Sequence, residues 1–189
     1  MLTLNLEATL QQSKKYRPWA EWFSRLDAED QRNVRLVCDA LTKVQEDSGS
    51  HFAVAAVGSS HDGSDSISEQ GDIDLVLVTV NPGTPDRRVL AVERLTSFIK
   101  KELNVPVECD GMTISWDRGE YYGVATWLFS FDCGHPVQLI LYVPSYRQLV
   151  AQKADLDGFL KEEERTHFDG SSYSMHGKKR YSVALLPLD

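Results

Sequence analysis

Apolar residues recur at helical spacing over much of the first 48 residues. Spacings of three and four place side chains on one face of a helix, so the stripe is typical of a helix that packs on a core. Its members are Val34, Val37, Leu41 and Val44. Asp27 precedes the stripe and belongs to the residue types that cap helix N-termini. We therefore expect a helical N-terminal part over residues 1–48, with Asp27 near the start of its main helix.

Strand patterns begin directly after this helical part. Residues 52–57 form an apolar run, and a second run covers residues 73–80 before an Asn-Pro-Gly turn. Residues 84–103 then return to helical periodicity. This helix is expected to end before Pro106, because the residue before a proline disfavours the helical conformation.

The C-terminal half reads as three further strands and a helix. Residues 105–115 and 121–131 alternate between apolar and polar positions and are joined by a polar turn, which predicts a hairpin. Residues 137–143 are almost continuously apolar, which indicates a strand buried on both faces. A capping pattern at Ser145 opens the last predicted helix.

Together these elements predict one α+β domain, in which a mixed sheet has helices packed on one side. The whole chain, residues 1–189, is expected to form this single domain. The sheet covers residues 52–143, and residues 145–189 supply the C-terminal helix and a tail.

Composition narrows the function classes. A net charge of −8 argues against a long nucleic-acid track, which needs a basic surface. No apolar run approaches the roughly 20 residues that span a bilayer, and the first residues lack the pattern of a signal peptide, so we expect a cytoplasmic protein with no membrane partner. The three cysteines, Cys38, Cys109 and Cys133, include no close pair and fit reduced thiols better than a zinc site.

The clearest chemical signal is a pair of aspartates, Asp72 and Asp74, at the start of the second strand run. Side chains alternate along a strand, so the two carboxylates point the same way while Ile73 and Leu75 point to the other face. Like charges held this close repel each other. A divalent cation offsets the repulsion, and Mg²⁺ is commonly held by one or two carboxylates plus substrate phosphates. The pair therefore predicts a site for Mg²⁺ or Mn²⁺.

A polar turn directly after the first strand supplies a second signal. It begins Gly58-Ser59-Ser60 and contains a further glycine at Gly63. Glycine lets backbone N–H groups approach a phosphate closely, so such a turn can cradle a phosphorylated ligand. Either signal alone is common in proteins, but the two in this order favour a functional site.

This combination resembles the signature of the DNA polymerase β-like nucleotidyltransferase superfamily. The resemblance covers residues 53–80 closely, although Gly71 stands where members usually carry serine. It implies that Gly58, Ser59 and Ser60 bind the triphosphate of an NTP, with ATP favoured, and that Asp72 and Asp74 hold Mg²⁺ ions. The implied reaction is transfer of an NMP to a hydroxyl acceptor with release of pyrophosphate. The acceptor stays open between an RNA end, a small molecule and a protein.

Two-metal phosphoryl transfer normally uses a third acidic group on a neighbouring strand. Two arrangements of the strands are open. In one, the strand after the long helix lies beside the aspartates and places Glu108 there as a third catalytic residue. In the other, a hairpin intervenes and the last strand brings Gln138 or Ile140 to that position, neither of which is a carboxylate. The second arrangement favours a catalytically degenerate relative that acts as a nucleotide-binding or protein-interaction module.

Overall fold

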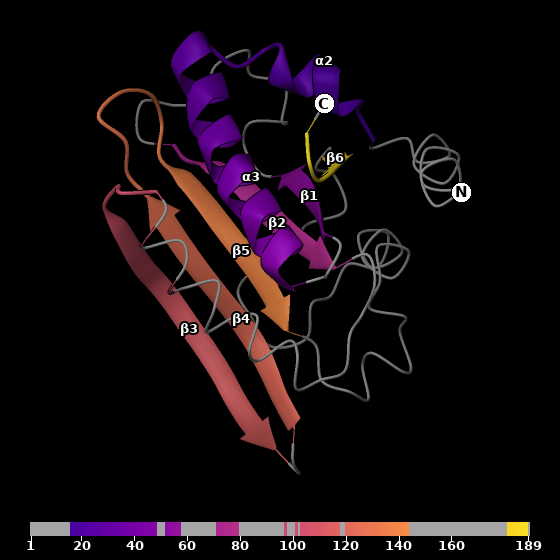
Figure 1. Ribbon diagram of the computed structural model, residues 1–189, viewed down its shortest axis with the longest axis vertical. Coiled ribbons are helices and arrows are strands. Elements are labelled where there is room, and N and C mark those ends of the chain that lie inside the picture. The colour runs from indigo at the N-terminus through magenta and orange to yellow at the C-terminus, as the bar shows by residue number, and fades with distance from the viewer. Residues whose placement is uncertain are drawn as a thin grey trace.

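The computed structural model describes residues 16–48, 52–57, 71–79, 97, 101, 103–117, 120–143 and 181–188. Two helices and six strands are assigned in these ranges (Figure 1). The helices are α2 (Trp19–Phe23) and α3 (Ala28–Ser48). The strands are β1 (Phe52–Val57), β2 (Ile73–Thr79), β3 (Val107–Asp117), β4 (Glu120–Phe129), β5 (Val137–Val143) and β6 (Ser182–Leu185).

The strands form one sheet in the order β3-β4-β5-β2-β1-β6. Only β2 and β5 are parallel neighbours; the other adjacent pairs are antiparallel. The fold is therefore α+β with a mixed sheet, as the sequence predicts. In Figure 1, β3 and β4 form a long hairpin at one edge, and α3 runs along the central strands.

One face of the sheet packs against α3 and α2. The apolar stripe of α3 is buried as predicted, with Val34, Val37 and Leu41 at most 1% exposed. These side chains join a core cluster that includes Ile73 and Leu75 of β2. The predicted cap is also present, because Asp27 Oδ1 accepts a hydrogen bond from the Asp30 N–H at 2.8 Å. Helix, cap and core face thus follow directly from the periodicity.

A second, smaller cluster covers the opposite face of the sheet around β1. Its buried members are Ala53, Ala55, Val57, Val76, Tyr181 and Val183. Because both faces of β1 are covered, all six residues of this strand are buried. This explains why the β1 sequence is apolar throughout instead of alternating.

Two differences from the sequence-based expectations are visible. The N-terminal helical part is divided, since residues 24–27 separate α2 from α3. Strand β6 pairs with β1 at the edge of the sheet, although the sequence analysis predicts only a tail there. The helix predicted over 84–103 lies mainly outside the described residues; among its described residues, 97 and 101 are assigned as helical. The helix predicted after Ser145 lies entirely outside the described residues. No helix in the described part of the chain is both long and apolar enough to cross a membrane.

Candidate functional site

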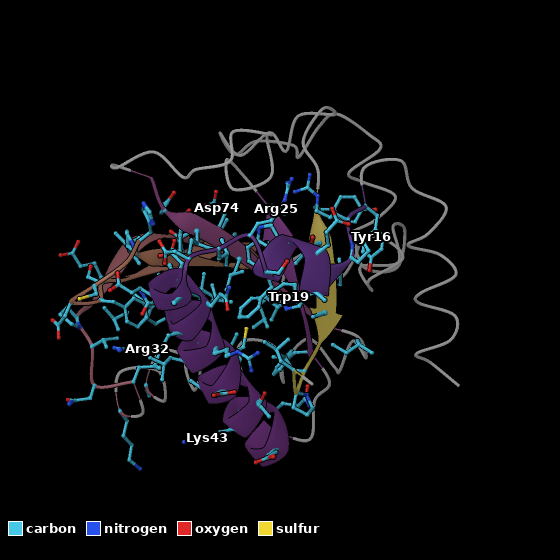
Figure 2. All side chains as sticks on the ribbon, turned by 90° about the horizontal axis from the view of Figure 1, so that it is seen from above. Tyr16, Trp19, Arg25, Arg32, Lys43 and Asp74 are labelled. Atoms are coloured by element: carbon cyan, nitrogen blue, oxygen red, sulfur yellow. The ribbon has the colours of Figure 1, made fainter. Side chains whose placement is uncertain are left out.

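Asp74 is the second residue of β2 and Asp72 immediately precedes the strand, and both residues are half-buried. Ile73, between them, is fully buried in the cluster under α3. Alternation along the strand therefore directs the two carboxylates to the opposite face of the sheet. Figure 2 shows Asp74 on the side of the sheet away from α3.

Three strand ends meet at this position. Strand β1 ends at Val57, which pairs with Asp74. Strand β5 begins at Val137, which pairs with Ile73 in the parallel ladder. The Gly58-Ser59-Ser60 turn itself lies outside the described residues, but it follows directly after Val57 along the chain. The chain therefore enters the predicted phosphate-binding turn from a residue that neighbours Asp74.

The strand beside the aspartates is β5, and it places Gln138 directly opposite Asp74. Ile140 lies two residues further along and pairs with Val76. Gln138 is buried at 7% exposure. An amide oxygen can contact a cation, but it carries no formal charge and cannot replace a carboxylate as a metal ligand of equal strength.

Glu108 does not lie beside the aspartates. Of the two strand arrangements that the sequence leaves open, the one that makes Glu108 a third catalytic residue is therefore wrong. The register runs from Glu108 to Leu128, then to Gln138 and Asp74, which places Glu108 three strands away. Strands lie about 4.8 Å apart, so the backbone separation is about 14 Å. Carboxylates that share one Mg²⁺ each lie about 2.1 Å from the ion, which this separation does not allow. The reason is topological: the β3–β4 hairpin occupies the sheet edge, and β5 pairs with β2.

A second group of polar side chains lies where α3 begins and β4 connects to β5. Asp27, Asp30 and His135 each offer one atom that could bind a metal ion, and these atoms all lie within 4.8 Å of one another. The sequence analysis identified Asp27 only as a helix cap. It gave no role to Asp30 or His135, because 105 residues separate them in the chain.

Hydrogen bonds already account for most oxygen atoms of this group. Asp30 Oδ1 accepts the backbone N–H of His135 at 2.7 Å, and Asp30 Oδ2 lies 2.8 Å from His135 Nδ1. Asp27 Oδ1 accepts the Asp30 N–H. The positive end of the α3 dipole lies at the same place and favours carboxylates over a bound cation. The group is therefore well explained as a contact between helix and turn.

No protein-family model matches this chain, and neither a curated protein nor a solved structure matches it. Function is therefore inferred from the residues around Asp72 and Asp74 and from their neighbours in the sheet.

Proposed function

We propose that this protein binds a nucleoside triphosphate together with Mg²⁺ or Mn²⁺ and transfers its nucleotidyl group slowly or not at all. Asp72 and Asp74 hold the metal ion, and the turn that begins at Gly58 contacts the phosphates. ATP is the nucleotide that the family resemblance favours. The observation that carries the proposal is the pairing of Gln138 with Asp74 on the neighbouring parallel strand.

The metal part rests on the two carboxylates. They lie at and just before the start of β2, where strand alternation directs both to the same face, and both are partly withdrawn from solvent. Partial burial strengthens the repulsion between them, because the effective dielectric constant is lower than in water. A hard cation that also binds phosphate oxygens removes this repulsion and couples nucleotide binding to metal binding.

The expectation that nucleotidyl transfer is slow or absent rests on the neutral side chain of Gln138. In a two-metal reaction, one ion activates the attacking hydroxyl and the other stabilises the leaving group. Two carboxylates suffice to anchor the ion bound to the nucleotide. The second ion would have a neutral amide where a carboxylate is needed, so its affinity would be low. The reaction implied by the family resemblance, NMP transfer to a hydroxyl, is then the competing hypothesis.

Calorimetry with MgATP tests the binding part. Asp74→Asn should lower the affinity at least tenfold, since it removes one of two charged ligands. Glu108→Gln is a matched control: it makes the same chemical change in the same register row, three strands away and exposed. It should bind as the wild type does. Equal affinity of Asp74→Asn and wild type, with circular dichroism showing both folded, would refute the metal site.

Pyrophosphate release tests the catalytic part. The four NTPs are offered with a mixed pool of RNA and small-molecule acceptors, and release is compared between the wild type and Gln138→Asp. We expect little release from the wild type and a clear gain in the variant, because aspartate restores a third charged ligand beside Asp74. Rapid release by the wild type would instead identify a transferase that does not need a carboxylate at this position.

A further inference from the structure

The turn between β4 and β5 is fastened to the first turns of α3. Asp30 receives both the backbone N–H and the ring nitrogen of His135. Asn33, one helical turn further along, donates from Nδ2 to the carbonyl of Cys133 at 2.8 Å, and Nδ2 lies 3.4 Å from the His135 carbonyl. Asp30 and Asn33 are 2% and 1% exposed. We call Asp30, Asn33 and His135 the α3 latch.

The α3 latch is connected to the candidate site through the residues that follow His135 in the chain. Pro136 follows His135, and its carbonyl accepts the N–H of Ile73 at 2.9 Å. Ile73 lies between the two aspartates, and β5 continues from Val137 to Gln138, the partner of Asp74. A short path of bonded neighbours thus joins the start of α3 to both strands that carry the site.

We propose that the α3 latch sets the position of β5 relative to β2 and thereby the geometry of the Asp72–Asp74 site, with His135 as a positioning residue. His135 does not touch the ligand in this role; it fixes the Pro136 carbonyl against the Ile73 N–H. The expected effect on nucleotide binding rests on the proposed function. The expected effect on the position of β5 relative to β2 does not. The buried side chains of Asp30 and Asn33 bind a turn that lies 100 or more residues away in the chain. These bonds hold the turn in addition to the pairing of β4 with β5.

The hydrogen bonds of the α3 latch explain this group of residues better than a metal site formed by the same residues does. Both oxygens of Asp30 are engaged by His135, and one oxygen of Asp27 caps α3. A metal ion would have to replace the contact between Asp30 and His135 Nδ1. It would also bring positive charge to the N-terminus of a helix.

The test compares His135→Ala with His135→Asn. The Asn Nδ2 can take the place of the ring Nδ1 and donate to Asp30, so this variant should rescue the effect of the alanine. Amide hydrogen exchange at Ile73 is the first readout. We expect His135→Ala to reduce its protection by about tenfold or more, the range for a lost hydrogen bond to a charged group. Val37→Ala is the control, because it destabilises the α3 core without touching the turn.

A positioning role predicts that Ile73 loses more protection in His135→Ala than the global stability change explains, and that Val37→Ala shows no such local excess. Ile73 protection that follows global stability alone in both variants would overturn the proposal. Uptake of Mn²⁺ or Zn²⁺ by the wild type that is lost in His135→Asn would also overturn it, since the group would then be a metal site.

The second readout is MgATP affinity, which should fall in His135→Ala and return in His135→Asn. An unchanged affinity in His135→Ala, in a protein that binds MgATP, would overturn the link from latch to site. If the wild type binds no nucleotide, the proposed function fails, and hydrogen exchange at Ile73 still decides whether the latch positions the strands.

Discussion

Replacing Gly134 with alanine is the sharpest single test of how the β4–β5 turn is held. Gly134 adopts φ +78°, a left-handed conformation that side chains disfavour. An added Cβ would lie 2.8 Å from Asn33 Nδ2 and 2.8 Å from Asp30 Oδ1. These are two of the hydrogen-bonding atoms of the α3 latch, so the substitution would push the turn away from the helix without removing any latch side chain.

The expected cost has two parts. The left-handed conformation costs an L-residue about 1–2 kcal/mol. Displacing the turn weakens a hydrogen bond to the Asp30 carboxylate, a class of bond that contributes about 1.5–3 kcal/mol. A backbone movement cannot remove both costs. Moving the turn outward relieves the contact of the new Cβ, but it lengthens the hydrogen bond to Asp30. We therefore expect a loss of about 3–4 kcal/mol in the free energy of unfolding, or about 10 °C in Tm for a chain of this size.

Thermal and urea unfolding followed by circular dichroism would measure this loss. Asp132→Ala is a suitable control, because Asp132 is exposed and lies two residues earlier in the same connection. Surface substitutions of this kind usually change stability by no more than about 0.5 kcal/mol. If Gly134→Ala and Asp132→Ala unfolded at the same temperature, the close packing of the turn against α3 would be refuted.

Three further predictions follow from the cap of α3 and from Cys38. Asp27→Ala should cost about 1 kcal/mol in urea unfolding, because the Asp30 N–H loses its cap, and an unchanged midpoint would contradict the cap. Burial raises the pKa of the Cys38 thiol above its ordinary value of 9.0, so mass spectrometry after iodoacetamide treatment should find the exposed Cys133 alkylated and Cys38 protected until unfolding. The same shift means that the folded state loses stability as pH rises above 9.0, since the unfolded thiol ionises first.

Much of the local structure could be predicted from the sequence, because local patterns determine it. The predicted strand 52–57 agrees with β1, and 137–143 agrees with β5. The hairpin strands shift by only one or two residues at their ends. Strand β6 was missed because a four-residue run has too little periodicity to distinguish a strand from an apolar tail.

Strand order was not predictable in the same way, and the error at Glu108 follows from it. The pattern around Glu108 correctly indicates a strand, and its register row is the one that contains Asp74. Which strand lies next to β2 depends on pairing between distant segments, which periodicity does not report. The sequence therefore left two arrangements open, and the observed order places Gln138 rather than Glu108 beside the aspartate.

The parallel pairing of β2 and β5 links the two proposals. Parallel strands in register bring their starting points together, so the residues that lead into β2 and β5 meet at one edge of the sheet. The aspartates begin one strand, and the turn held by α3 precedes the other. A substitution in the first turns of α3 can therefore alter the carboxylate site through the backbone of β5 alone. For this reason we expect substitutions of Asp30 and His135 to weaken the proposed metal and nucleotide binding, although neither residue is part of the proposed site.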